Sequence, residues 1–529
     1  MWEKDWRKDA WQELNNPWDI VVIGGGITGA GIFRRAVAEG YRTLLLEAGD
    51  FASGTSSRSS KLIHGGFRYL RNKQYNVTKE SVREREWLLR EARNLVTPLG
   101  FIMPCPPDRH TAQQFAIGVV LYDLLAPKWQ HCRLSREKIL SICPQLDKPA
   151  LGEGFLYYDA AMDDARVVLR VIQEGVAAGG TALNYARVES LLRSSDNRVS
   201  GVALHDLSHD KLGSLEINAG VVINAAGPWS DEVRAELGAT PRLRKLRGSH
   251  LVFPAARLPL KHAVTLLHPD DHRAMFAIPW EGCTLVGTTD LDHKFPLHAG
   301  EPFTTPAEID YILRAADSTF PTLHLSQSDV ISSFSGLRPV VNTGNPDPSK
   351  ESRGHVVWEE QGLVTITGGK FTTFRIMAEK ALQIAVQQLT RKADFSARKR
   401  YFERLPEIDA IKGLPPEDMR YLLGRYGGET LPLLQAAREG ENEHISGLPN
   451  LWSELRWAAR TGAVQHLDDL LLRRVRLGML LADGALAEME HIRRIVQPEL
   501  GWEDEHWASE EARYREIYQR FYSPAPTGY

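Results

Sequence analysis

The sequence predicts an α/β protein built from several lobes, the first of which contains a parallel β-sheet. An apolar strand near the N-terminus runs into a glycine-rich turn and a helix. Strand-like runs with alternating polarity occupy the middle of the chain, and helical periodicity dominates after about residue 393. Because 529 residues exceed a typical single core, we expect two or three lobes.

The strongest local signal lies in the first 50 residues, which have the outline of a dinucleotide-binding βαβ unit. Residues 20–23 form an apolar strand, and Gly24, Gly26 and Gly29 fit Gly-x-Gly-x-x-Gly at the junction with a helix. These glycines permit the tight turn, the approach of a pyrophosphate and close packing of helix on strand. Glu47 ends the next strand, where its carboxylate can accept hydrogen bonds from a ribose 2′-hydroxyl.

The loop after Glu47 is long, polar and rich in glycine and hydroxyl side chains. Such a loop can wrap an extended cofactor, which favours FAD over NAD for the glycine motif. Gly65 and Gly66 allow the backbone to approach a flat ring. The predicted donors to a diphosphate and ribityl chain are Thr55, Ser56, Ser57, Ser60 and Lys61.

Several further motifs follow in a specific order and spacing. The motif segments are residues 24–31, 55–70, 163–166, 224–229, 248–250, 287–290, 336–339 and 368–375. Together they resemble the FAD-dependent glycerol-3-phosphate dehydrogenases of the aerobic, respiratory and quinone-linked type, over essentially the whole chain. Two departures stand out: Arg34, Arg35 and Glu39 replace the usual residues of the first helix, and Phe374 stands where the family usually has Tyr.

The resemblance implies a Rossmann-like FAD-binding domain with an inserted antiparallel-sheet substrate lobe, as in D-amino-acid oxidase, and an α-helical C-terminal domain. The predicted FAD-binding domain comprises residues 18–95, 155–240 and 336–390, and the substrate lobe comprises residues 96–154 and 241–335. The predicted N-terminal segment is 1–17, and the helical C-terminal domain is 393–529.

Individual elements are predicted from periodicity. A helix is expected over 163–178, ending at Gly179-Gly180, and helical faces over 467–481 and 485–495. The expected strands are residues 182–185, 199–205, 214–218, 221–223, 249–253, 274–278, 284–287 and 363–367.

The implied reaction is oxidation of sn-glycerol 3-phosphate to dihydroxyacetone phosphate by hydride transfer to flavin, with electrons passed to membrane quinone. A doubly charged phosphate needs clustered cations, and a base must take the hydroxyl proton. Motif matches place the substrate-binding residues at Arg68, Tyr69, Arg338, Arg353 and Lys370.

For the base, His250 is the first choice, with Arg338 beside it as a catalytic residue. His64 is the alternative, although its place in the cofactor loop favours a hydrogen bond to cofactor or backbone. Motif matches and loop chemistry give the cofactor-binding set Gly24, Gly25, Gly26, Thr28, Gly29, Glu47, Thr55, Ser56, Ser57, Ser60, Lys61, Leu62, His64, Gly65, Val188, Ala226, Gly227, Gly369 and Lys370.

Composition excludes some functions. A net charge of −3 gives no global reason to expect nucleic-acid binding. The cysteines lie far apart, without Cys-x-x-Cys or a His pair at ligand spacing, so we predict no metal site and buried thiols in a reducing compartment. They are Cys105, Cys132, Cys143 and Cys283.

No stretch approaches the about 18 apolar residues that a membrane-spanning helix needs. The charged N-terminus does not fit a signal peptide, so a cytoplasmic location is expected, with peripheral attachment to the inner membrane as the alternative. A helix bearing Trp2 and Trp6 could touch a membrane interface, but packing onto the body is favoured. A homo-oligomer is compatible with the sequence.

Four alternatives stay open at this stage. The same-class alternative is a glycerol-3-phosphate oxidase that reduces oxygen, although the mid-chain insertion common in those enzymes is not evident. An amine-oxidising flavoenzyme is compatible with the fold. The other two alternatives are a non-catalytic flavin-binding scaffold and an NAD-dependent enzyme.

Overall fold

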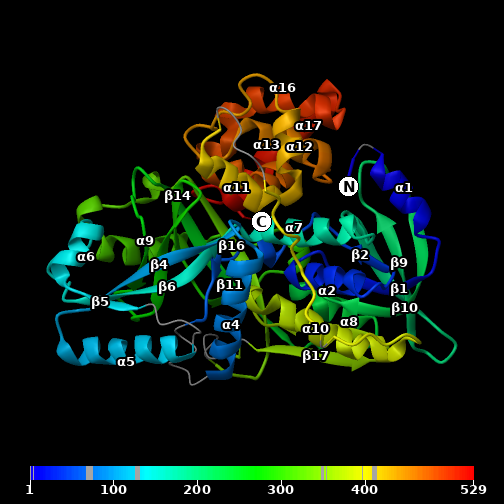
Figure 1. The fold of residues 1–529 in the computed structure, drawn as a ribbon, viewed down its shortest axis with the longest axis horizontal. Helices are drawn as coiled ribbons and strands as arrows, with labels where there is room; N and C mark the ends of the chain where they lie inside the picture. The colour runs from blue at the N-terminus through cyan, green and yellow to red at the C-terminus, as the bar shows by residue number, and fades with distance from the viewer. Residues whose placement is uncertain are drawn as a thin grey trace.

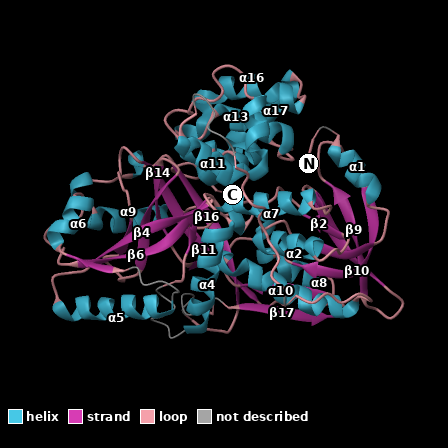
Figure 2. Cartoon of the chain, viewed as in Figure 1, coloured by secondary structure: helices cyan, strands magenta, loops and turns pink. Residues whose placement is uncertain are grey.

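Two β-sheets lie side by side, and a group of helices from the C-terminal part of the chain sits against both (Figure 1). Figure 2 shows the strands gathered in two groups, and every described strand belongs to one of these two sheets. The computed structural model describes residues 2–3, 5–66, 75–125, 131–346, 351–352, 354–395, 397–407 and 414–528.

The first sheet contains the predicted βαβ unit. Its strand order is β17-β18-β10-β1-β2-β7, with β8 and β9 joined to β10 as an antiparallel extension. Strand β1 pairs in parallel with both β2 and β10. The strands are β1 Trp18–Ile23, β2 Thr43–Leu46, β7 Thr181–Leu183, β8 Ala186–Arg193, β9 Val199–Asp206, β10 Ser214–Asn224, β17 His355–Glu360 and β18 Leu363–Gly368.

Steric contacts explain the glycine pattern between β1 and helix α2 (Ile27–Ala38). A Cβ at Gly29 would lie 1.8 Å from the carbonyl oxygen of Gly24, so only glycine lets the helix pack this closely. Gly24 has a φ of +110° and lies against the backbone of Ala225. The predicted strand, turn and helix are confirmed.

The second sheet is mostly antiparallel, with one parallel pair between β4 and β12. Its path is β15-β11-β14-β13-β12-β4-β6-β3, and β16 and β5 pair with β11 and β6. Its strands are β3 Leu62–Ile63, β4 Val96–Pro104, β5 Cys132–Leu134, β6 Gly154–Met162, β11 Leu243–Pro254, β12 Ala263–Leu267, β13 Ala274–Trp280, β14 Cys283–Gly287, β15 Leu291–Asp292 and β16 Ser332–Val341.

Strand membership differs from the expected domain boundaries for three strands. Strands β3, β6 and β16 belong to the second sheet, although all or most of their residues fall within segments predicted to be FAD-binding. Strand β10 is also one continuous strand over the residues expected to form two. The hydrophobic run Val221–Ile223 simply continues the strand into the buried sheet, as parallel pairing with β1 requires.

Helices cover both sheets. The predicted helix after residue 163 is confirmed as α7, whose first turn is capped by the Asp163 carboxylate accepting from the Arg166 N–H at 3.2 Å. The longer helices outside the C-terminal region are α1 Trp6–Glu13, α4 Tyr75–Glu91, α5 Arg109–Leu125, α6 Arg136–Ile142, α7 Asp164–Ala177, α8 Ser230–Ala235, α9 Pro306–Thr319 and α10 Phe374–Ala385.

The C-terminal region is helical as expected, and α16 (Met489–Leu500) covers most of the predicted face over 485–495, whereas the helical run expected over 467–481 is interrupted. A π turn occupies residues 470–474, and Arg476 has a φ of 68°, which ends that helical run. Positive φ values at residues 483–485 separate it from the next helix. The helices are α11 Pro416–Tyr426, α12 Thr430–Ala436, α13 Trp452–Thr461, α14 Leu467–Asp469, α15 Leu477–Leu480, α16 Met489–Leu500 and α17 Asp504–Ile517.

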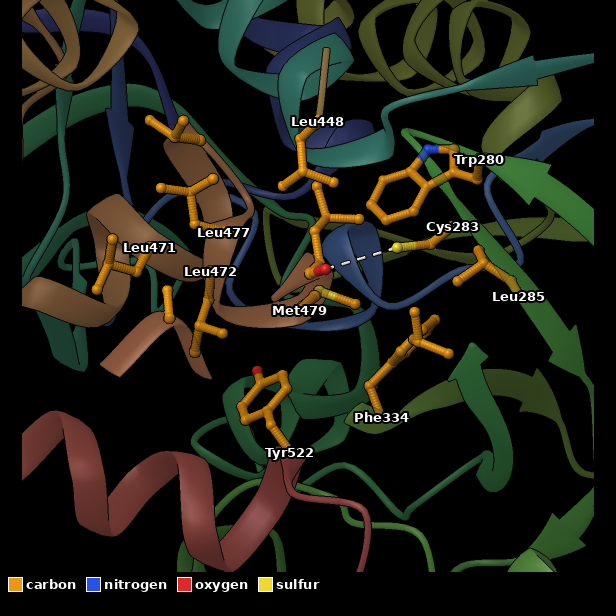
Figure 3. Close-up of a cluster of buried hydrophobic side chains, with 14 of the residues drawn as sticks. Trp280, Cys283, Leu285, Phe334, Leu448, Leu471, Leu472, Leu477, Met479 and Tyr522 are labelled. Atoms are coloured by element: carbon orange, nitrogen blue, oxygen red, sulfur yellow. Dashed lines mark hydrogen bonds between the residues drawn. The ribbon is translucent and has the colours of Figure 1, made fainter. Parts of the chain in front are cut away.

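A shared hydrophobic core joins the second sheet to these helices (Figure 3). Trp280 and Phe334 from the sheet belong to the same buried cluster as Met479 and Tyr522. The Cys283 thiol donates to the Leu480 carbonyl at 3.6 Å. The two parts therefore share one apolar interior rather than meeting at a polar interface.

The N-terminal segment packs onto the body, as favoured from the sequence. Trp2 is buried and stacks on Phe51 with ring centroids 5.1 Å apart. Three cysteines are buried as expected, but Cys132 is exposed on the edge strand β5, so its predicted burial is wrong. Among the described helices, none combines the length and the apolar character needed to cross a bilayer.

Candidate active site

A cavity of about 1080 Å³ opens among residues of both sheets and is the main candidate site. The N-terminal end of α2, the 55–66 loop, strand β16 and the turn after β18 line it on one side. The β12–β13 hairpin and α5 line the other. Of the predicted site residues, Thr28, Thr55, Ser56, Ser60, Leu62, His64, Arg338, Gly369 and Lys370 line this cavity.

The glycine motif and Glu47 stand at the α2 end of the cavity. The Glu47 carboxylate accepts from the N–H groups of Gly25 and Gly49, at 2.7 and 2.8 Å. Burial raises the pKa of Glu47 above its ordinary value, and these two hydrogen bonds oppose that effect. Ser56 Oγ accepts from the Ile27 N–H at 3.0 Å, which satisfies one donor of the helix terminus.

The residues around α2 fit a dinucleotide diphosphate. A Cβ at Gly26 would lie 3.1 Å from Ser56 Oγ, so the glycine keeps a space open between the loop and the helix terminus. Ile27 and Thr28 at that terminus line the cavity, where backbone N–H groups favour an anion. FAD would therefore fit these residues, and the terminus of α2 and the hydroxyls of the 55–60 loop would hold its diphosphate; these contacts stay predictions.

Other predicted cofactor residues lie beside the cavity rather than on its wall. Ala226 and Gly227 follow β10, next to the contact between Gly24 and Ala225. Val188 is a partly buried residue of β8, packed in the core of the first sheet and paired with Leu204. Their contacts with a cofactor stay predictions.

Lys61 departs from its predicted role. Its side chain is fully buried, and its ammonium donates to both carboxylate oxygens of Asp164, at 2.9 and 2.8 Å, and to the Ser57 carbonyl. Arg476 reaches the same carboxylate at 2.9 Å. Because these groups hold the ammonium away from the cavity, the expected hydrogen bond from Lys61 to a cofactor is wrong for its side chain.

The two candidate bases lie in different places. His64 lines the cavity, and burial lowers its pKa to about 4, with the nearby Lys370 ammonium acting in the same direction. His250 is buried behind Ser60, whose hydroxyl lies 2.8 Å from His250 Nε2, and its ring stacks on Phe334. It is not among the residues that line the cavity, and its role as the direct base stays a prediction.

Arg338 lies on the cavity wall as predicted. Its guanidinium donates to the Thr288 hydroxyl at 3.0 Å and lies 3.3 Å from the Asp290 carboxylate. Arg273 reaches the same carboxylate at 3.2 Å. One buried carboxylate is thus shared by two arginines that both face the cavity, which leaves positive charge directed into it.

Sequence reasoning missed Arg273 and His272, which line the cavity from the β12–β13 hairpin. Their flanks carry no glycine motif, and only the strand pairing brings them to the site. Arg68, Tyr69 and Arg353 lie outside the described residues. Phe374 is fully buried against Gly31 and Tyr401, so the missing hydroxyl at this position is not on the cavity wall.

Comparisons with known proteins agree with a FAD-binding site in this cavity. The family described as "FAD dependent oxidoreductase" matches residues 19–379, and "C-terminal domain of alpha-glycerophosphate oxidase" matches residues 364–507. A glycerol-3-phosphate dehydrogenase of Mycobacterium leprae is 35% identical, covering 96% of this chain and 89% of its own. This chain belongs to the FAD-dependent glycerol-3-phosphate dehydrogenase family.

Other family members and folds support the same assignment. An aerobic glycerol-3-phosphate dehydrogenase of Staphylococcus epidermidis is 35% identical over 86% of each chain. The structure of the Bacillus halodurans glycerol-3-phosphate dehydrogenase complexed with FAD matches 100% of both chains, with a TM-score of 0.78 and 29% identity. The L-α-glycerophosphate oxidase of Mycoplasma pneumoniae shares the fold, with a TM-score of 0.59 and 17% identity.

Proposed function

We propose that this enzyme oxidises sn-glycerol 3-phosphate to dihydroxyacetone phosphate and passes the electrons to a membrane quinone. The observation that carries the proposal is the paired arginine arrangement, in which Arg338 and Arg273 share Asp290 at the cavity wall. Lys370 lines the same cavity. A phosphoester carrying nearly two negative charges is the ligand that such a cluster favours.

The carboxylates on the cavity wall do not cancel this preference. Glu351 is held by Arg244 and by the Thr343 hydroxyl, the latter at 2.7 Å. Asp271 accepts from the Tyr311 hydroxyl at 2.9 Å. Arg273, Arg338 and Lys370 line the cavity beside these groups, and two of these three cations share the single carboxylate of Asp290.

His64 is the proposed acceptor of the substrate hydroxyl proton. It lines the cavity, and with a pKa of about 4 its imidazole is neutral at pH 7 and has a ring nitrogen that can accept a proton, although the same shift makes it a weaker base than an ordinary histidine. FAD, when bound, supplies the hydride acceptor. His250 acts through Ser60, whose hydroxyl it positions on the cavity wall.

The apolar face of α5 supports the proposed contact with a membrane. Ile117, Leu121 and Leu124 are 62, 40 and 65% exposed and follow a helical spacing of four and three residues. Ile117 and Leu121 also line the cavity. An apolar acceptor such as quinone could therefore approach the cavity from the lipid side, with the protein attached peripherally to the cytoplasmic face of the membrane.

Anaerobic mixing of the FAD-loaded protein with sn-glycerol 3-phosphate tests the reaction. Loss of the oxidised flavin absorbance supports the proposal, whereas a flavin that stays oxidised supports a non-catalytic scaffold. Adding either a soluble quinone or oxygen to the reduced protein then separates the dehydrogenase from an oxidase. Faster reoxidation by the quinone is expected, and faster reoxidation by oxygen would overturn this part of the proposal.

A further inference from the structure

A histidine cluster lies away from the cavity, where the first sheet meets the C-terminal helices. His209 lies in the turn between β9 and β10, and His506 and Glu510 lie one turn apart on α17. One ligand atom from each of the three residues falls within 4.8 Å of the other two. His209 is distant in sequence, so the cluster exists only in the folded chain.

Several observations show that these side chains are arranged for a shared ligand. His209 Nε2 lies 3.6 Å from a carboxylate oxygen of Glu510. His506 Nε2 is buried and has no hydrogen-bond partner among the described residues. A buried ring nitrogen without a partner is costly, and a bound ion would satisfy it.

The surroundings hold the ligands in place. The His506 ring stacks on Trp502, with centroids 4.7 Å apart and planes 8° apart. The Glu510 carboxylate accepts from His466 Nδ1 at 2.9 Å and from the Leu467 N–H at 3.1 Å. Such outer contacts orient metal ligands in known sites.

We propose that His209, His506 and Glu510 bind a divalent transition-metal ion, with zinc the best fit to two imidazoles and one carboxylate. Tetrahedral zinc needs ligand atoms about 3.3 Å apart, given bonds of about 2.0 Å. His209 and Glu510 nearly meet this spacing. The distances between ligand atoms that are still too long would be shortened by movement of the His209 side chain, which is 39% exposed.

The contacts of Glu510 leave it able to bind a cation. One carboxylate oxygen accepts from His466 Nδ1 and lies 3.6 Å from His209 Nε2, and the other accepts from the Leu467 N–H, with Arg513 3.9 Å away. Because a carboxylate oxygen has two lone pairs, the first oxygen can accept the His466 hydrogen bond and still face the ion.

The ion would join two parts of the chain that are far apart in sequence. It would connect the β9–β10 turn to α17 and thus fix the C-terminal helices against the first sheet. The prediction of no metal site rested on linear spacing among cysteines and histidines, which cannot register a ligand contributed from about 300 residues away.

The test uses the full-length, FAD-loaded protein, stripped with a chelator and then equilibrated with zinc chloride. After desalting, elemental analysis should find one zinc per chain, and zinc should raise the unfolding temperature. His209→Gln should weaken zinc binding at least tenfold and abolish the thermal shift. His298→Gln, an exposed histidine elsewhere, is the matched control and should behave like the unsubstituted protein.

Two outcomes would overturn the proposal: no retained zinc, or equal retention in the His209→Gln variant. Glu510→Gln provides a second ligand variant, and because the His209 side chain is 39% exposed, its substitution stays informative if Glu510→Gln fails to fold. The measurement does not depend on substrate turnover, so its result is independent of the proposed reaction.

Discussion

Single charged side chains determine which ligand the cavity can hold. Asp290 is almost fully buried and interacts with both Arg338 and Arg273, so one carboxylate is shared by two guanidinium groups. Sharing fixes the two guanidinium groups relative to each other. An incoming phosphate would therefore meet a preorganised pair of donors rather than two mobile surface chains.

We expect Arg338→Ala to lower kcat/KM for glycerol 3-phosphate roughly 10- to 150-fold, because a charge-assisted hydrogen bond contributes about 1.5 to 3 kcal/mol. Steady-state kinetics with a soluble acceptor measure this. Arg198→Ala is the control, since Arg198 forms an exposed pair with Glu359 away from the cavity. Unchanged kinetics in Arg338→Ala would remove Arg338 from the substrate site.

The proposal that His64 rather than His250 is the general base leads to a separate prediction. His64→Gln should slow flavin reduction by about 10²- to 10⁴-fold, the usual range for a general base. His250→Gln should have a smaller effect, because His250 reaches the cavity only through Ser60. Rapid-mixing absorbance measurements compare the two variants, and a larger loss in His250→Gln would reverse the assignment.

The pH dependence follows from the His64 pKa of about 4. A base works in its neutral form, which dominates above the pKa, so flavin reduction should stay level from pH 8 to about pH 5. It should fall only as the pH approaches 4. A fall centred near 6.5, the ordinary value for histidine, would show that His64 is not the base or is more exposed in the working enzyme.

Sequence motifs predicted which residues lie near the site more reliably than they predicted where the side chains of those residues point. Ser60 and Lys61 are neighbours in one motif, yet Ser60 lines the cavity whereas the ammonium of Lys61 lies beside Asp164. His250 shows the same difficulty, because it sits one layer behind the wall. Contacts with partners about 100 or more residues away decide these directions, and no local pattern encodes them.

At the scale of elements, sequence patterns predicted the structure correctly where short-range features alone determine it. The β1–α2–β2 unit follows from glycine sterics and an apolar strand, and both features are local. The region 467–485 has helical periodicity, but Arg476 leaves helical geometry and its guanidinium donates to the Asp164 carboxylate at 2.9 Å. At Arg476 a long-range ion pair accompanies a break in the helix, and the periodicity of the sequence did not predict this break.

The exposed apolar face of helix α5 leads to a prediction about membrane binding. Leu124→Gln should weaken binding to anionic phospholipid vesicles about tenfold or more, because burial of a leucine contributes about 1.5 to 3 kcal/mol and glutamine adds no charge that the lipid would attract. Cosedimentation measures the bound fraction. Leu431→Gln on α12 is the control, since Leu431 is also an exposed leucine, at 40%, but lies on the C-terminal helices. Equal binding of both variants would exclude α5 as the contact surface.

Across the whole molecule, buried ion pairs tie the C-terminal helices to the first sheet. Asp50 follows the Glu47 turn, and its carboxylate accepts from Arg474 at 2.6 and 2.7 Å and also from Arg473. Asn184 donates to the same carboxylate at 3.1 Å. All four side chains are buried, so the network positions the cofactor-side loop against the C-terminal region.

Asp50→Asn should destabilise the protein by about 3 to 5 kcal/mol, because it leaves the buried Arg474 without its carboxylate and removes one of the three carboxylates that pair with Arg473. Burial raises the pKa of Asp50, but Arg474 and Arg473 outweigh this and hold it below its ordinary value. A carboxyl with a lowered pKa stabilises the fold above its unfolded pKa and loses that effect as the pH falls through its folded pKa. The difference from the unsubstituted protein should therefore be full at pH 7 and shrink in strong acid.

Thermal unfolding followed by circular dichroism and flavin fluorescence measures this difference. Asp317→Asn, at an exposed position on α9, is the matched control and should change the unfolding temperature little. If the network couples the two regions, Asp50→Asn should also release flavin at a lower temperature, because the loop beside Glu47 loses its support. An unfolding temperature equal to that of Asp317→Asn would show that the buried pairs do not hold the regions together.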